Sequence, residues 1–500
     1  LARYHATREA SSGPVVFDFA GQPALRWEGL PGLPADADYA LAADAGATGA
    51  VLTARSPAGL EVERRISLHD RYRIAVTDRL RNGSAQPLAA ATNWVSLGVF
   101  RNGTSKNDTL GADAFGAGPG DKAKVRHFER DIARALGGGG GFGCFGGGAA
   151  RQPNPQATIP ADGPWQWVAV KSRFFTQVLL PRTECAGFRI GASAAPAGEK
   201  RNPVGSVAAA AAFAGFTLQP GETLERSVVL YVGPKRLATL ASIGPRVDEV
   251  MEFGTFKWFC KLLVPTLNFF YRVIPSYGVA IILLTILVRV IFWPLTHKST
   301  ESMKRMQTLQ PQLKALQAQH KDNPQKLQQE TWRIYRENKV NPLSSCLPML
   351  VQIPIFIALY TVLRSAVELR FAPFLWIGDL SEPENLLAGV LPLPLNILPI
   401  LMAATMGLQS YLTPSMGDPA QQKMMMVLMP GMMLFMFYSM PAALSLYWTV
   451  SQVISILQML LQRYRTKAAQ GGGGSGAVIV EAPAAVTRQM RRHAAPPGGQ

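Results

Sequence analysis

Residues Gly278–Thr296 read GVAIILLTILVRVIFWPLT, an apolar run with one charged side chain, Arg289. As a helix, the run is long enough to cross a hydrocarbon core of ~30 Å. A guanidinium stays protonated in proteins, and placing it at membrane depth costs ~2.5–3.5 kcal/mol. Charged side chains at that depth usually face a bundle interior or a water-filled cavity, which makes Arg289 a candidate functional residue. The alternative is that it snorkels to the interface near Thr296, about 10 Å away along the helix.

Four more apolar runs follow, so the sequence predicts a helical bundle of five membrane spans. The spans are Gly278–Thr296, Ser345–Leu363, Leu395–Thr413, Met424–Met440 and Ala442–Leu461. Residues 297–341 hold nine Lys/Arg and four Asp/Glu, whereas residues 364–394 hold two and four. The positive-inside rule therefore places 297–341 and the basic C-terminal tail in the cytoplasm, and the first half of the chain outside. An exported first half needs an anchor, so we expect a sixth span before Leu1.

The first half predicts an antiparallel β-sandwich over 1–240, because short alternating segments such as Leu60-x-Val62 are separated by turn signals. The chain has 500 residues, a formal charge of +17 and a mean hydropathy of +0.10. Much of the positive excess flanks the spans, where it sets topology. Residues 241–277 are predicted as a linker whose aromatic part, Phe253–Ser276, lies as a helix in the membrane interface. The glycine-rich run 137–148 is predicted to be a mobile loop.

Catalytic and metal-binding signals are weak in this half. Its three histidines, His5, His69 and His127, sit in no motif and are interpreted as ordinary surface or loop residues. Cys144 and Cys185 either pair after export or stay as free buried thiols. The chain contains no zinc-type cysteine cluster and no phosphate-binding G-x-x-x-x-G-K-[ST] pattern, so we expect no metal and no nucleotide.

Residues 297–341 predict two short helices that fold back on each other. Leu309, Leu313 and Leu316 form one apolar stripe, and the break follows at Asn323-Pro324, where Asn323 can cap the second helix. We interpret this hairpin as a docking arm for a cytoplasmic partner. The alternative is a connector that keeps two spans apart.

Polar side chains gather in the cytoplasmic half of the predicted spans. Thr285 and Arg289 share a helix face because they are four residues apart, and Gln352 and Ser451 fall on other spans. No Asp or Glu lies inside any predicted span. A hydrated groove open to the cytoplasm would explain both the cluster and the arginine. The absence of carboxylates counts against an ion-coupled transporter.

Four stretches resemble the YidC-type membrane protein insertases of Gram-negative bacteria: ILVRVIFWPLTHKSTESMKRMQTLQP, NPLSSCLPMLVQIPIFIALYTVLRSAVELRFAPFLWIGDLS, DPAQQKMMMVLMPGMM and LSLYWTVSQ. The resemblance covers about 250–467 and extends more loosely to the first half. It implies a periplasmic β-supersandwich, a transmembrane insertase core over 278–467 and a multi-pass protein of the bacterial inner membrane. It implies no enzyme activity and no cofactor, and the tail 468–500 is expected to be disordered.

The family's functional residues carry over by position. Arg289 matches the groove arginine, and Tyr447-Trp448 match an aromatic pair that touches the substrate, with Trp448 in place of a tyrosine. The predicted groove is Thr285, Arg289, Gln352, Tyr447, Trp448 and Ser451. The predicted docking residues are Lys304, Arg305, Lys314, Lys321, Lys326, Arg463 and Arg465.

The resemblance implies four kinds of partner: nascent membrane proteins, the Sec translocon, the ribosome with the signal-recognition machinery, and membrane lipids. One rival is a secondary transporter that uses the same polar cavity. The other is an enzyme in the outer domain with the spans as its anchor.

Overall fold

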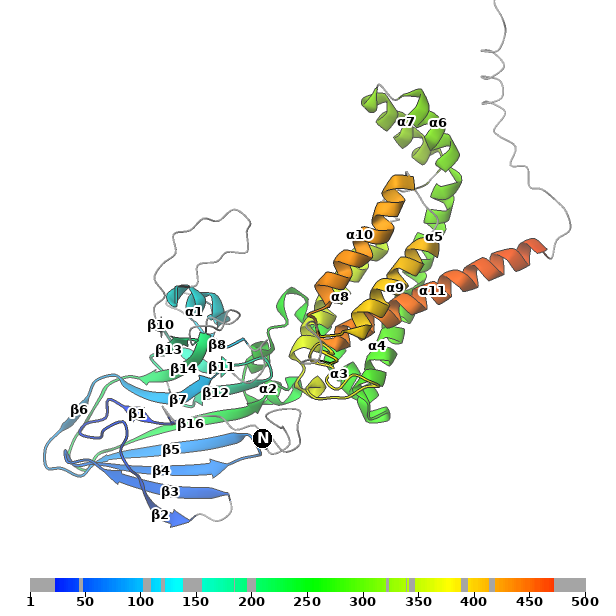
Figure 1. Cartoon of the computed structure of the whole chain (residues 1–500). Coiled ribbons are helices and arrows are strands. Elements are labelled where there is room, and N and C mark those ends of the chain that lie inside the picture. The colour runs from blue at the N-terminus through cyan, green and yellow to red at the C-terminus, as the bar shows by residue number, and fades with distance from the viewer. Residues whose placement is uncertain are drawn as a thin grey trace, which may run out of the picture.

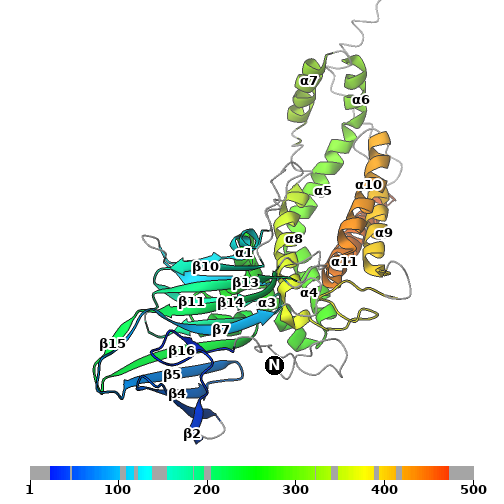
Figure 2. The same cartoon turned by 60° about the vertical axis from the view of Figure 1, so that its left-hand side comes forward.

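The computed structural model describes residues 23–44, 48–101, 109–117, 122–137, 155–183, 185–195, 204–320, 323–338, 340, 347–387, 394–412 and 419–471. A β-rich half lies beside a helical half, and a helical arm projects from the helical half away from the sheets (Figure 1). The turned view in Figure 2 shows the same separation. The glycine-rich run from 138 onward, Cys144, His5 and the tail beyond 471 lie outside the described residues.

The β-rich half contains two large antiparallel sheets, which confirms the predicted class of this region. The five-stranded sheet has the order β1 (Trp27–Glu28), β7 (Asn93–Arg101), β14 (Val204–Phe213), β13 (Gly187–Ala194) and β10 (Gln156–Asp162). The nine-stranded sheet has the order β2 (Ala40–Asp44), β3 (Gly49–Arg55), β4 (Leu60–Leu68), β5 (Arg73–Asn82), β16 (Thr223–Pro234), β12 (Phe175–Pro181), β11 (Trp165–Lys171), β8 (Gly111–Gly116) and β9 (Lys124–His127). β6 (Leu88–Ala90) and β15 (Phe216–Leu218) form a small third sheet.

Strand β11 explains how this half meets the helices. Its side chains alternate between two apolar cores: Val168 and Val170 face the five-stranded sheet, whereas Trp167 and Ala169 face the helical side. Both faces of the strand are therefore buried from Trp167 onward, where the sequence reads WVAVK, and the exposed Gln166 lies near its start. The second core continues through α2 (Leu237–Ile243) and the 3₁₀ turn η2 (Val247–Met251) into the helical half.

A buried charge pair ties the two large sheets together. Asp78 of β5 accepts hydrogen bonds from Arg64 Nε at 2.7 Å and Nη2 at 2.9 Å, both within the nine-stranded sheet. It also accepts one at 2.8 Å from the indole Nε1 of Trp27, which belongs to the five-stranded sheet. Asp78 and Arg64 are 2% and 7% exposed, so neither charge has water to replace a lost partner.

We predict that Asp78→Asn destabilises the β-rich half by about 3–5 kcal/mol, because Arg64 keeps its buried charge and loses its counter-ion. Glu63→Gln is the matched control: Glu63 pairs with Arg65 at the surface, and such a pair contributes about 0–1 kcal/mol. The measurement is denaturant unfolding of the purified protein, followed by tryptophan fluorescence. Equal losses in the two variants would contradict the role given to Asp78.

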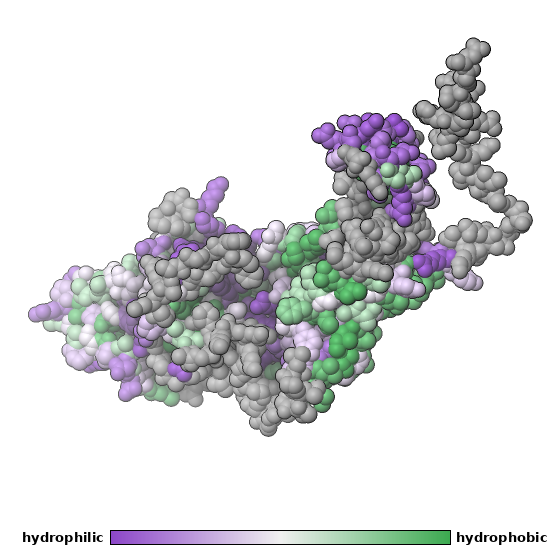
Figure 3. All heavy atoms as spheres, turned by 45° about the horizontal axis from the view of Figure 1, so that its top comes forward, coloured by the Kyte–Doolittle hydropathy of each residue, from purple (hydrophilic) through white to green (hydrophobic). Residues whose placement is uncertain are grey.

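The helical half contains α3 (Lys257–Val273), α4 (Tyr277–Ile291), α5 (Trp293–Thr308), α6 (Gln310–Gln319), α7 (Pro324–Glu337), α8 (Leu347–Ser365), α9 (Ile397–Leu412), α10 (Pro419–Phe437) and α11 (Ala442–Gly471). Within the described residues, Ala442–Tyr464 is the helix long and apolar enough to cross a membrane by itself. Tyr277–Ile291 with Trp293–Ser299 passes only as a bent pair, and Gln352–Ser365, Ile397–Leu412 and Met426–Phe437 are shorter apolar helices. Figure 3 shows apolar side chains over the helical half and hydrophilic ones on the arm.

The predicted first span, Gly278–Thr296, is bent near its end. Helix α4 stops at Ile291, and the chain bends by 57° before Trp293 begins α5. Pro294 explains the break, since it has no N–H for the helical ladder and its ring clashes with the carbonyl four residues earlier. The helical arm therefore starts at Trp293.

In the predicted hairpin region the chain reverses direction between α6 and α7, and its described residues form three helices, α5, α6 and α7, where two were predicted. The helix predicted to carry the Leu309 stripe is broken into α5 and α6 at Leu309 itself. The reversal falls where it was predicted, because the side chain of Asn323 accepts from Lys326 N at 3.0 Å and caps α7.

Three other boundaries differ from the prediction. Helix α10 begins at Pro419 and ends at Phe437, a few residues earlier than predicted at both ends. Helix α11 continues through Gly471, past the predicted start of the tail at 468. Helix α2 crosses the predicted domain limit at 240. The interfacial segment does contain a helix, α3, whose outward residues Trp258, Leu262, Phe269 and Val273 are 69%, 59%, 59% and 63% exposed.

Arg173, just beyond β11, joins the two halves. Its Nε donates to the carbonyl of Arg364 at 2.7 Å. Its Nη1 donates to Glu382 Oε1 at 2.5 Å, and its Nη2 donates to the Ser381 carbonyl at 2.5 Å. The Arg173 side chain is 4% exposed. One buried guanidinium therefore fastens the end of α8 and the loop after it to the nine-stranded sheet.

Candidate functional site

Arg289 is held between two helices. On the last turn of α4, it donates from Nε to the hydroxyl of Ser451 on α11 at 3.0 Å. Its Nη2 donates to the same hydroxyl at 2.5 Å and to the Ser451 carbonyl at 2.9 Å. Among the residues that the structure describes, Arg289 has no ion pair and its Nη1 donates no hydrogen bond. These contacts give a fixed geometry in place of a snorkelling side chain, and they leave donors unused.

Gln352 extends the polar contacts to a third helix. Its Nε2, on α8, donates to the Tyr447 hydroxyl on α11 at 2.7 Å. Tyr447 is one helical turn before Ser451, so the two side chains lie on the same face of α11. A row of polar side chains therefore runs from α8 through α11 to α4, and we call Gln352, Tyr447, Ser451 and Arg289 the polar chain. Sequence spacing placed these side chains at similar depth, and the structure brings all four together.

The two remaining predicted groove residues lie beside the polar chain. Thr285 is fully buried, and its hydroxyl donates to the carbonyl of Ile281 at 2.7 Å, so it supports helix packing and offers no proton to a groove. Trp448 packs against Phe356 and Phe437, with ring centroids 5.2 and 5.5 Å apart. The indole therefore contributes an apolar surface next to the polar chain.

The predicted docking residues are spread over the arm and α11. Lys314 and Lys326 are exposed on α6 and α7, and Arg305 on α5 forms an exposed ion pair with Glu301 at 2.8 Å. Arg463 donates to the carbonyl of Leu412 at the end of α9. The side chains of Lys304, Lys321 and Arg465 lie outside the described residues.

A second polar cluster lies in the outer half, and sequence reasoning missed it. The ammonium of Lys171, at the end of β11, lies 2.7 Å from Asp113, 2.8 Å from Glu129 and 2.9 Å from Glu252. The Nδ1 of His127 is 2.7 Å from Asp113 Oδ1. His127 and His69 are both exposed, as expected of surface residues, but the bond to Asp113 makes His127 part of the cluster. Widely separated positions supply the cluster, and the only local signal was a lysine ending an apolar strand.

The cluster is occupied by its own cation. Asp113, His127, Glu129 and Glu252 bring ligand atoms within 4.8 Å of one another, which is a spacing that could hold a metal. Lys171 fills that position with an ammonium, and burial does not neutralise it because the three carboxylates raise its pKa above the ordinary value.

Cys185, another buried group of this half, is a free thiol whose Sγ lies 3.0 Å from the Gly187 carbonyl.

Comparison with known proteins gives matches over most of the chain. The family model described as the YidC periplasmic domain matches residues 147–265, and that of the 60Kd inner membrane protein matches residues 269–469. A membrane protein insertase YidC of Francisella tularensis subsp. novicida is 34% identical over 403 residues, which make up 80% of this chain and 67% of that protein. The chain belongs to the YidC family.

Other relatives of the YidC family match a shorter part. The membrane protein insertase YidC of Pelobacter propionicus is 41% identical over 298 residues, 59% of this chain and 53% of that protein. This chain thus spans about half the length of that relative. A solved structure described as an active YidC insertase with its first transmembrane domain resolved is 18% identical, with a TM-score of 0.36, over 84% of this chain and 95% of that one.

We call the group formed by Lys171, Asp113, His127, Glu129 and Glu252 the acid cluster. It makes the stability of the fold depend on pH through His127. Its hydrogen bond to Asp113 raises the pKa of His127 above 6.5. A raised pKa in the folded state stabilises the fold fully below the unfolded pKa, and the contribution is lost as pH rises through the folded pKa. We predict that, at pH values below 6.5, His127→Gln unfolds at a lower temperature than the unsubstituted protein. The unfolding midpoints of the two proteins should converge as the pH rises above that value. Thermal unfolding of both proteins over that pH range measures this. A constant difference would contradict it.

Proposed function

We propose that this chain inserts newly made membrane proteins into the bacterial inner membrane from the cytoplasmic side. The observation that carries the proposal is the guanidinium of Arg289, fixed by Ser451 among apolar helices and with donors left unused. Family membership supports it, since the matched relatives are membrane protein insertases by name. We propose further that the protein acts alone or with the Sec translocon, and that it needs no cofactor.

The proposed topology has five spans, α4, α8, α9, α10 and α11, after a periplasmic β-supersandwich. The basic loop 297–341 supports this orientation, and so does the position of the arm, which projects from the end of the helices away from the sheets (Figure 1). We propose that the exposed lysines of the arm and the basic end of α11 dock the ribosome and the signal-recognition machinery.

The proposed mechanism is solvation of a polar flank during its passage. A short hydrophilic segment of the client enters between α4 and α11. The Nη1 of Arg289 donates to its carbonyl or carboxylate oxygens, and each such hydrogen bond contributes ~1.5–3 kcal/mol. This offsets part of the several kcal/mol that an unsatisfied polar group loses in lipid. The apolar part of the client leaves along Trp448 and neighbouring apolar side chains into the bilayer.

A secondary transporter would use the same polar chain for a small solute. In the helices α4, α8, α9, α10 and α11 the sequence contains no Asp or Glu, so the carboxylates that usually couple ion flow are absent from the described spans. Solute uptake by proteoliposomes in an ion gradient, without insertion, would favour the transporter.

We predict that Arg289→Ala lowers insertion about tenfold or more, because at least one charge-assisted hydrogen bond is lost. Arg289→Lys keeps the charge and should retain most of the activity. Ser451→Ala removes the hydroxyl but leaves the backbone carbonyl, so we expect an intermediate loss. The assay synthesises a single-span client beside liposomes that contain the full-length protein and measures protease protection of the translocated tail.

Arg272→Ala is the matched control, since Arg272 is exposed on α3 away from the polar chain. It should leave insertion unchanged. Protection no better than with empty liposomes for the unsubstituted protein would overturn the proposed function. Equal activity of all Arg289 variants would leave insertion standing and remove Arg289 from its mechanism.

A further inference from the structure

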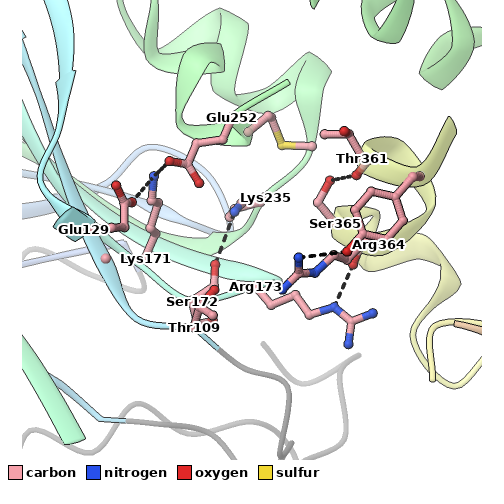
Figure 4. A pocket seen from close by; sticks show the side chains of 13 residues that line it. Thr109, Glu129, Lys171, Ser172, Arg173, Lys235, Glu252, Thr361, Arg364 and Ser365 are labelled. Atoms are coloured by element: carbon pink, nitrogen blue, oxygen red, sulfur yellow. Dashed lines mark hydrogen bonds and ion pairs between the residues drawn. The ribbon is translucent and has the colours of Figure 1, made fainter. Parts of the chain in front are cut away.

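A cavity of about 260 Å³ lies between the two halves and takes no part in the proposed insertion mechanism. Its walls come from the end of β11 with the residues after it, the end of β16, α1 (Glu129–Ala135), the end of η2 and the last turns of α8. Figure 4 shows charged side chains lining it from both halves. The cavity is smaller than the ~300–1,000 Å³ typical of pockets for drug-sized ligands, so it suits a small polar group.

One wall of the cavity is acidic. Glu129 and Glu252 line it, and both contact the same ammonium, that of Lys171, which Asp113 also contacts. Three carboxylates thus surround one lysine. Burial raises the pKa of Glu129 despite the nearby ammonium, which indicates that its negative charge is poorly compensated.

The opposite wall carries cations with unused donors. Lys235, at the end of β16, is 4% exposed, and its Nζ donates to the Ser172 carbonyl at 3.2 Å. Arg364, on α8, donates to the Tyr360 hydroxyl at 3.1 Å. Neither forms an ion pair within the described residues. Burial, together with the nearby Lys171, lowers the pKa of Lys235 to about 8, although the carboxylates of the acidic wall act in the opposite direction.

Arg173 also lines the cavity, but the donors of its guanidinium are used by other protein groups. Its guanidinium is bonded to Glu382 and to the carbonyls of Ser381 and Arg364. The cations available to a ligand are therefore Lys235 and Arg364. A buried lysine with spare N–H donors is uncommon in a native protein and calls for a partner.

We propose that this cavity binds the headgroup of a phospholipid that carries both a phosphate and a primary amine. The phosphate is held by Lys235 and Arg364, and the ammonium of the headgroup is held by Glu129 and Glu252. Opposite charges on the two walls fit a zwitterion better than a simple anion, which the acidic wall would repel, or a simple cation, which Lys235 would repel.

The position of the cavity supports a lipid as the source. It lies at the end of α8 nearest the sheets, and α3 follows Glu252 within a few residues and exposes an apolar face. A helix with such a face lies in the membrane interface, at the level of the headgroups. The proposal rests on the proposed topology, which puts this end of the bundle at the outer membrane surface.

The test measures binding of short-chain phospholipids to the purified full-length protein by thermal stabilisation, below the micelle concentration of each lipid. Dihexanoyl phosphatidylethanolamine should raise the unfolding midpoint. Dihexanoyl phosphatidylglycerol and phosphatidylcholine should raise it much less, since one lacks the amine and the other has no N–H to donate to the carboxylates. Equal stabilisation by the three lipids, or none by phosphatidylethanolamine, would overturn the proposal.

Lys235→Met should weaken binding by ~10-fold or more, through loss of a charge-assisted hydrogen bond, while it removes a buried charge and so keeps the fold. Arg364→Gln is the second variant if Lys235→Met does not fold. Lys257→Met is the matched control because Lys257 is exposed and pairs with Glu249; it should change affinity by less than ~2-fold. Loss of binding in Lys257→Met equal to that in Lys235→Met would overturn the site.

Two further comparisons separate the sources and the functions. Soluble glycerophosphoethanolamine tests the headgroup alone: weaker binding than the lipid supports a membrane source, and equal binding overturns it. Insertion by Lys235→Met should match the unsubstituted protein. If insertion fails for every protein while phosphatidylethanolamine still binds, the proposed function falls and the lipid site stands. If insertion is normal and no lipid binds, the lipid site alone falls.

Discussion

The burial of strand β11 on both faces is the constraint on which the arrangement of this protein depends. Its side chains belong alternately to the core between the two sheets and to the core shared with the helices, so neither half can shift without exposing apolar surface. Arg173, directly after the strand, adds directional contacts to the end of α8 and to the loop after it. The β-rich half and the bundle are thus joined by packing and not by a linker alone, and the cavity lies at their junction.

The polar chain and the acid cluster each hold a buried cation, but with different partners. In the acid cluster, a buried ammonium is surrounded by three carboxylates. In the polar chain, a guanidinium has only neutral oxygens from one serine among the described residues. The first arrangement is an ion cluster, whereas the second keeps a charge without a counter-ion, which in the proposed mechanism meets the client polypeptide.

The sequence predicted what local rules control and missed what long-range packing controls. The reversal at Asn323 follows from a capping side chain and a proline, and it was found. The apolar run up to Thr296 was read as one helix, although Pro294 breaks it, because composition outweighed the proline in that interpretation. The acid cluster joins residues from 113 to 252 that meet only when β8, β9 and β11 pair and η2 docks. No spacing pattern in the sequence predicts that these residues lie close together.

The anchoring of Arg289 has an electrical consequence. A side chain fixed by the backbone and hydroxyl of Ser451 does not move along the membrane normal, so the transmembrane voltage does no work on it. In the proposed mechanism an acidic flank of the client does move past it, and each elementary charge that crosses gains or loses ~2.3 kcal/mol per 100 mV. With the inside negative, that energy favours outward transfer of acidic flanks and opposes basic ones. The arginine is then a stationary charge beside a moving one, and the voltage supplies the work.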